Sequence, residues 1–240
     1  MRSTSHPLSK VEALKRDAAR EALRRVRSGM RLGLGTGSTM AHFVDLLGES
    51  LSQGRLSDVV GMPTSERTRA QATELGIPLE PLHAIQPLDL AVDGADEVDL
   101  KLDLVKGLGG AFLREKIVVQ AARRFVVIVD ESKSVDRLGR QAPLPVEVVP
   151  FSWEAHLEPL RALGLDPVLR KDEEEEPYRT DNGNYVLHLN PSADGFPDPA
   201  ALDRQLHSRA GIVETGFLLG LADEVIFAGP EGIRTVERSR

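Results

Sequence analysis

Short apolar segments alternate with amphipathic segments through the first half of the chain, and this alternation limits the possible folds most strongly. The apolar segments have the length of strands, and most of the intervening stretches have helical periodicity. The expected strands are residues 30–34, 59–62, 79–82, 88–92 and 125–129, and the expected helices are 10–26, 40–51, 66–75 and 111–123. Buried strands that alternate with helices form a mainly parallel sheet covered on both faces. We therefore predict an α/β fold.

After Lys133 the pattern changes to strand, helix, strand, strand, helix, strand. These elements are expected at 143–151, 152–163, 167–171, 185–189, 199–209 and 213–217. This order is typical of a small ferredoxin-like α+β domain, and we expect Phe151 and Trp153 in its core. A last segment, 224–228, has the apolar character of the first strands. We predict a discontinuous larger domain, 1–142 plus 218–240, and a small domain, 143–217; residues 1–8 are expected to be a loose terminus.

Composition excludes several classes of function. The 240 residues carry a net charge of −7, whereas a protein that binds nucleic acid needs a clustered basic face. There is no apolar run of the roughly 20 residues that span a bilayer. The absence of cysteine fits a reducing cytosol, so we expect a cytoplasmic protein without membrane contact. The histidines are scattered without metal-ligand spacing, so we predict no metal site, and we expect the acidic run 172–176 to be a solvated hairpin loop.

Residues 93–116 combine acids, a lysine and glycines in one stretch. Asp93 and Asp96 follow the strand 88–92, at the carboxyl end where open α/β sheets bind ligands. The run 106–110 is too rich in glycine for the inside of a helix and predicts a tight loop. Glu115 then falls in the early turns of a helix. Such a site suits a polar, anionic small molecule.

Each of these side chains also has an ordinary structural explanation. The two aspartates can orient sugar hydroxyls, or serve as a helix cap and a surface acid; Glu97 and Asp99 are expected in solvent. Glu115 can be a general base if it is partly buried, or a common early-helix glutamate. Lys106 can neutralise an oxyanion, or lie on the surface.

The glycine-rich run 33–39 lies between a strand and a helix. Glycines and free amides at a helix N-terminus can bind phosphate, with Ser38 and Thr39 adding hydroxyls. A turn that merely packs helix on strand remains the alternative. The run is not a Walker loop, because no lysine follows its last glycine. The dinucleotide-binding fingerprint needs a third small residue at its sixth position, and Ser38 occupies that position here. Lys133, after the strand 125–129, can pair with the same phosphate.

Six motifs, taken together and in this order, closely resemble ribose-5-phosphate isomerase of type A. They are GLGTGST, DGADE, KGLGGAFLREK, DESK, PLPVEVVPF and TDNGN, and the match runs from about residue 9 to 229. The resemblance implies a Rossmann-like larger domain, a ferredoxin-like smaller one, and a homodimer or homotetramer. It also implies interconversion of ribose 5-phosphate and ribulose 5-phosphate in the pentose phosphate pathway, without metal or organic cofactor.

The resemblance also implies roles for particular residues. Glu115 matches the base that transfers the proton, and Asp93, Asp96 and Lys106 match groups that orient the substrate and stabilise charge. One departure is Leu108, where members of this family often carry glycine. The implied substrate-binding positions are Lys15, Thr36, Gly37, Ser38, Thr39, Gly94, Ala95, Gly107, Leu108, Gly109 and Lys133.

Two rival functions remain open. A related α/β enzyme can deaminate an amino-sugar phosphate or transfer coenzyme A; the first calls for a histidine in the site and the second for a glutamate nucleophile. A non-catalytic sugar-phosphate sensor is the other rival. A sensor would usually carry a DNA-binding appendage and lose the base, yet Glu115 is present.

Overall fold

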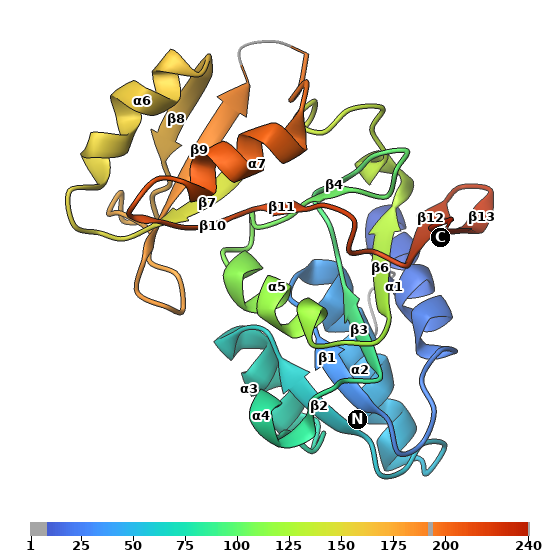
Figure 1. Ribbon diagram of the computed structural model, residues 1–240. Helices are drawn as coiled ribbons and strands as arrows, with labels where there is room; N and C mark the ends of the chain where they lie inside the picture. Colours follow the sequence, from blue (N-terminus) through green and yellow to red (C-terminus); the bar gives the residue numbers. More distant parts are fainter. Residues whose placement is uncertain (1–8, 192–193, 240) are drawn as a thin grey trace.

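The computed structural model describes residues 9–191 and 194–239, and its main feature is a six-stranded sheet (Figure 1). The strand order is β13-β12-β6-β3-β1-β2, and all neighbours are parallel except β13, which is antiparallel to β12. The predicted α/β class with a mainly parallel sheet is confirmed. The strands are β1 (Arg31–Leu34), β2 (Val60–Pro63), β3 (Leu90–Asp93), β6 (Phe125–Asp130), β12 (Glu224–Gly229) and β13 (Gly232–Glu237).

The two faces of this sheet contact different apolar clusters, because side chains alternate along a strand. Leu90 and Val92 of β3 pack in one cluster with residues of helices α1 (Lys10–Leu23) and α2 (Ser38–Ser52). Ala91 points the other way and packs in a second cluster with Val119 of α5 (Phe112–Gln120). Covered on both faces, β1, β3, β6 and β12 are largely buried, as their apolar runs predict, whereas β13 is mostly exposed. A further helix of this part, α3 (Glu66–Glu74), follows β2.

A second sheet lies beyond the first (Figure 1) and contains four antiparallel strands in the order β10-β7-β9-β8. The chain order β7, α6, β8, β9, α7, β10 is the predicted ferredoxin-like pattern. The bounds are β7 (Leu144–Val148), 3₁₀-helix η2 (Trp153–His156), α6 (Leu157–Ala162), β8 (Leu165–Leu169), β9 (Tyr185–Pro191), α7 (Pro199–His207) and β10 (Ile212–Thr215).

Of the two aromatic residues expected in the core of this part, only one is there. Trp153 packs against its apolar cluster, but Phe151 is 86% exposed, so that expectation was wrong. Phe151 lies in the turn between β7 and η2, outside the alternation of a strand. The acidic run 172–176 is exposed between the bridged residues Lys171 and Pro177, as a hairpin loop should be.

Three two-residue strands form a small sheet that the sequence did not predict. They are β4 (Glu97–Val98), β5 (Leu104–Val105) and β11 (Phe217–Leu218), in the order β11-β5-β4. The expectation that Glu97 lies in solvent was wrong: its side chain is fully buried. Its carboxylate accepts hydrogen bonds from the backbone amides of Gly139, Gln141 and Ala142. Those amides belong to the segment that leads into β7, so Glu97 anchors the approach to the second sheet.

The prediction of a strand at 79–82 was also wrong. Only Leu79 forms a bridge, to Gly61, and residues Leu82–Ile85 form the short helix α4. Pro78 and Pro81 carry no amide hydrogen, so this segment cannot form a continuous ladder. No helix among the described residues has both the length and the apolar character needed to cross a membrane. The chain returns to the first sheet at β12, beside β6, but the proposed domain boundaries stay a prediction.

Candidate active site

A cavity of about 520 Å³ opens beside the carboxyl ends of β3, β6 and β12 and the N-terminus of α2. It collects residues that lie far apart in the chain, as ligand sites at this edge of an α/β sheet do. Most of the predicted site residues line it, whereas Asp93 and Leu108 do not. The lining residues predicted from the sequence are Lys15, Thr36, Gly37, Ser38, Thr39, Gly94, Ala95, Asp96, Lys106, Gly107, Gly109, Glu115 and Lys133.

One ammonium group lies between two carboxylates at the inner end of the cavity. Lys106 Nζ is 3.1 Å from Asp93 Oδ1 and 3.3 Å from Glu115 Oε2. It also donates to the carbonyl oxygen of Gly94 at 2.6 Å. All three side chains are buried. The structure therefore brings the predicted base, the predicted cation and the first predicted aspartate into direct contact.

Burial and charge shift the pKa values of this group. Burial, reinforced by the carboxylate of Asp93, raises the pKa of Glu115 to about 8, although Lys106 opposes the shift. Burial also raises the pKa of Asp93, against the pull of Lys106. For Lys106, burial disfavours the charge, but the carboxylates of Asp93, Glu115 and Asp96 outweigh it and raise the pKa. The lysine remains a cation, and Glu115 can gain or lose a proton near neutral pH.

Asp93 is held from the backbone side. Its Oδ1 accepts hydrogen bonds from the amides of Thr36 (3.1 Å) and Gly94 (2.7 Å). Its Oδ2 is buried and accepts no hydrogen bond from any described residue. A Cβ at Gly35 would lie 2.2 Å from the Asp93 carboxyl, so only glycine lets the turn after β1 pass this close. The glycine-rich turn and the DGADE motif are thus parts of one site.

The loop 106–110 closes over Asp96. Asp96 Oδ2 accepts a hydrogen bond from the amide of Leu108 at 3.0 Å. The Leu108 side chain does not line the cavity, so this position takes part through its backbone. Gly107 has a φ of +111° and packs on Phe112, at the start of α5, which a residue with a Cβ could not do.

The outer end of the cavity can receive a phosphate. The first residues of α2 line it, with Gly37 as the N-cap, so the free amides of a helix N-terminus and the Ser38 and Thr39 hydroxyls are available there. Lys133, in the 3₁₀-helix η1 (Glu131–Lys133), forms no ion pair with the residues the structure describes. Lys15 also lines the cavity, but it pairs with Glu12 at 2.7 Å.

Comparison with known proteins identifies the family. Residues 60–232 match the family of ribose 5-phosphate isomerase A (phosphoriboisomerase A). The chain belongs to this family. It is 51% identical to the ribose-5-phosphate isomerase A of Rhodopseudomonas palustris, covering 95% of this chain and 99% of that one. It is 48% identical to the enzyme of Chloroflexus aurantiacus, covering 95% of each.

A solved structure agrees with the sequence comparison. A D-ribose-5-phosphate isomerase in complex with phospho-erythronic acid superposes with a TM-score of 0.92 at 42% identity, covering 96% of this chain and all of that one. The family resemblance and the predicted enzyme class, an isomerase, are therefore confirmed.

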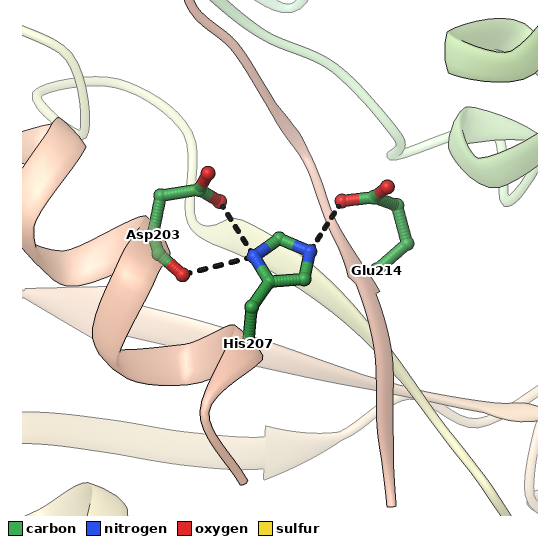
Figure 2. Close-up of side chains that lie close together, drawn as sticks. All are labelled: Asp203, His207 and Glu214. Atoms are coloured by element: carbon green, nitrogen blue, oxygen red, sulfur yellow. Dashed lines mark hydrogen bonds and ion pairs between the residues drawn. The ribbon is translucent and has the colours of Figure 1, made fainter.

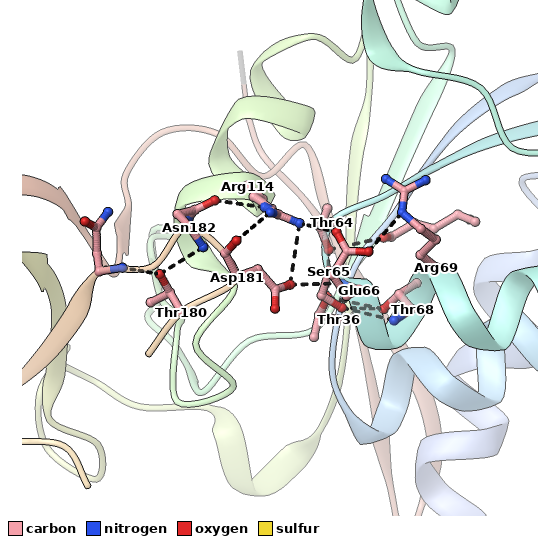
Figure 3. Close-up of polar contacts among 12 residues, drawn as sticks. Thr36, Thr64, Ser65, Glu66, Thr68, Arg69, Arg114, Thr180, Asp181 and Asn182 are labelled. Atoms are coloured by element: carbon pink, nitrogen blue, oxygen red, sulfur yellow. Dashed lines mark hydrogen bonds and ion pairs between the residues drawn. The ribbon is translucent and has the colours of Figure 1, made fainter. Parts of the chain in front are cut away.

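A cluster of buried hydroxyls lies around Thr36, which lines the cavity, and was not predicted (Figure 3). Thr36 Oγ1 lies 2.8 Å from Thr64 Oγ1 and from Ser65 Oγ, and 3.3 Å from Thr68 Oγ1. Thr68 in turn donates to the carbonyl of Gly35 at 3.0 Å. The cluster holds the residue whose amide binds Asp93. Its only signal in the sequence is the polar turn 64–68 after an apolar strand.

Outside the cavity, a group of two acids and a histidine has a geometry that could hold a metal ion (Figure 2). His207 lies between Asp203 and Glu214, with Nε2 2.9 Å from Glu214 Oε1. The same Glu214 oxygen accepts from Lys116 Nζ at 2.6 Å and from the amide of Thr215. A lysine on the shared oxygen competes with a cation, so the ion pairs account for this cluster, and the absence of a metal stays a prediction.

Proposed function

We propose that this protein interconverts D-ribose 5-phosphate and D-ribulose 5-phosphate, with Glu115 transferring a proton between C2 and C1. One observation carries the proposal. Glu115 is a buried carboxylate whose pKa lies near 8, it is 3.3 Å from the ammonium of Lys106, and it lines a cavity that can receive a phosphate. A general base works best when its pKa is near the operating pH.

The substrate's phosphate binds at the N-terminus of α2. Ser38, Thr39 and the free amides there donate hydrogen bonds, and Lys133 supplies a positive charge. Lys15 contributes at the same end once the phosphate competes with Glu12. The sugar then extends toward Asp96, Lys106 and Glu115. Phospho-erythronic acid, bound by the solved relative, carries a carboxylate and a phosphate on a short polyol, a charge pattern that suits this cavity.

Isomerisation follows ring opening. Glu115 takes the proton from C2, and the electron pair moves through C1 to O1, giving an enediolate. The proton on O2 passes to O1, and Glu115 returns its proton to C1 as the carbonyl forms at C2. Lys106 lies beside this oxygen pair and stabilises the negative charge. The burial of Glu115 and Lys106 keeps water away from the intermediate.

We assign ring opening to Asp93, which does not line the cavity itself but contacts Lys106 and Gly94, which do. Its raised pKa and unpartnered Oδ2 suit a carboxyl that exchanges a proton with the sugar ring. Asp96 lines the cavity and orients the substrate's hydroxyl groups. Asp93→Asn should therefore lower turnover on the cyclic sugar phosphate more than Asp96→Asn does.

The rival functions have less support. No histidine is among the described residues that line the cavity, which weakens an amino-sugar phosphate deaminase. His42 lies nearby but is bound to Glu12 at 2.8 Å. A sensor without activity has no use for a buried carboxylate and lysine in contact, because burying charge is unfavourable.

We further propose that the reaction needs neither metal nor organic cofactor, and that the protein acts in the cytoplasm as a homodimer or homotetramer. These points come from the family resemblance. They are independent of the assignment of Glu115.

Glu115→Gln tests the assignment. The amide keeps the size of the side chain but cannot take a proton, so kcat should fall by about 10²–10⁴-fold with little change in KM. Turnover of ribose 5-phosphate is measured with EDTA present. Glu74→Gln, an exposed change at the end of α3, is the matched control and should keep normal turnover. Normal turnover in Glu115→Gln would overturn the proposal.

A further inference from the structure

The second sheet contributes no side chain to the cavity, yet it contacts the residues on both sides of Glu115. The described residues that line the cavity stop at Lys133 and resume at Ala228, so those of β7 to β10 are not among them. Arg114 and Lys116 nevertheless both bind groups of the second sheet and its loops. The contacts of these two neighbours suggest what this sheet does for the reaction.

Arg114 contacts two parts of the chain at once (Figure 3). Its Nε donates to Asn182 Oδ1 at 2.9 Å, and one guanidinium nitrogen donates to the carbonyl of Asp181 at 2.8 Å. The other nitrogen donates to Glu66 Oε1, also at 2.8 Å. Asp181 closes the contact by accepting from the amide of Glu66 at 2.9 Å. Arg114 therefore joins α5, the start of α3 and the loop 180–184.

The loop 180–184 is built to present these acceptors. Glu147 of β7 is fully buried, and its Oε1 accepts from Thr180 Oγ1, Asn182 Nδ2 and Asn184 Nδ2 at 2.8–3.1 Å. Asn182 thus binds Glu147 with its amide nitrogen and Arg114 with its oxygen. The position of the loop, and through it of Arg114, depends on a strand of the second sheet.

Lys116 makes the corresponding contact on the other side of α5. Its Nζ binds Glu214 Oε1 at 2.6 Å and the carbonyl of Thr215 at 3.1 Å, both at the end of β10. Figure 2 shows His207 of α7 supporting the same Glu214. Lys116 is 8% exposed, so this ion pair is well shielded from solvent.

These two contacts oppose rotation of α5 about its axis. Consecutive residues of a helix point about 100° apart, so Arg114 and Lys116 flank the direction of Glu115. The carboxylate lies about 6 Å from the helix axis, so a rotation of about 10° would move it by about 1 Å. A displacement of about 1 Å can lower the rate about 10²-fold.

We propose that Arg114 and Lys116 are positioning residues, through which the second sheet sets the placement of Glu115 against Lys106 and the substrate. The inference rests on the proposed role of Glu115. Neither residue takes part in proton transfer.

Steady-state kinetics and pH profiles of single variants test this inference. Arg114→Met and Lys116→Met should each lower kcat about tenfold or more with KM nearly unchanged, because the phosphate end is intact. The pH at which kcat/KM reaches half its maximum should also move, because the pKa of Glu115 depends on its burial and on its distances from Asp93 and Lys106. Lys116→Arg should restore most of kcat.

Changes on the second sheet give the same test without altering α5. Asn182→Ala removes an acceptor of Arg114, and Glu214→Gln removes the charge that pairs with Lys116. Both changes should reproduce the loss of kcat and the shift in pH profile. Two matched controls should leave both unchanged. Arg69→Met removes the other partner of Glu66, at 3.2 Å, and Lys171→Met breaks an exposed pair with Glu175.

The outcomes separate this inference from the proposed function. If Glu115→Gln is inactive but the variants at 114, 116, 182 and 214 keep normal kcat and pH profile, the positioning role is wrong and the base assignment stands. A lower melting temperature with unchanged kcat per folded molecule would also overturn it. If Glu115→Gln keeps normal turnover, the proposed function fails, and this inference with it.

Discussion

The raised pKa of Glu115 predicts the direction of the pH dependence. Its pKa is raised by burial to about 8, and a base must have lost its proton to act. We expect kcat/KM to rise as pH increases through about 8 and then to level off. The substrate's phosphate, whose second pKa is about 6, titrates well below this range. A pH–rate profile from 6 to 9.5 measures the effect, and a flat or falling profile would contradict it.

The same shift predicts an effect on stability. The folded pKa of Glu115 is above the unfolded value of 4.5, so its contribution to stability is greatest at low pH and is lost as pH rises toward 8. Glu115→Gln removes a carboxyl group that destabilises the folded state when it is ionised. Its melting temperature, relative to the parent protein, should therefore be higher at pH 8.5 than at pH 5. If the two proteins differed in melting temperature by the same amount at both pH values, the pKa of Glu115 would not be raised in the folded state.

At the scale of elements, Glu97 predicts how the segment into the second sheet is held. Its buried carboxylate accepts hydrogen bonds from three backbone amides, and the one from Ala142 is 2.8 Å long. Glu97→Gln places an NH₂ group where donors already converge, so we expect the free energy of unfolding to fall by about 1–3 kcal/mol. Urea unfolding measures the change. Glu80→Gln, at an exposed site, is the control; equal stability in both variants would mean that Glu97 is dispensable.

The long elements could be predicted from the sequence because their patterns are local. Apolar runs and helical periodicity located most of the main-sheet strands, α2 and the elements of the second sheet. Two-residue strands such as β4 and β5 have no period to detect, and β13 is mostly exposed. The run 79–82 has the apolar ends of a strand, but Pro81 within it and Pro78 before it prevent one. Glu97 was predicted to be a surface acid because its neighbours in the sequence do not include the amides that donate hydrogen bonds to it.

For the molecule as a whole, the site could be predicted only where chemistry and strand ends coincide. Asp93, Asp96, Lys106 and Glu115 occur within one motif-rich stretch, so their meeting in space follows from a single strand–loop–helix unit. The partners of Arg114 in the loop 180–184 lie 67–68 positions away, and those of Lys116 lie 98–99 away. Such pairings depend on how the two sheets pack, which no local pattern encodes.

The most direct test of the account is hydrogen exchange at C2 of the substrate. Ribose 5-phosphate is incubated with the protein and EDTA in heavy water, and ketose formation and deuterium at C2 of the aldose are followed by NMR. We predict ketose formation and deuterium at C2 with the parent protein, and neither with Glu115→Gln. Ketose formation with normal exchange in that variant, or loss of all turnover of the parent protein with EDTA, would contradict a metal-free proton transfer by Glu115.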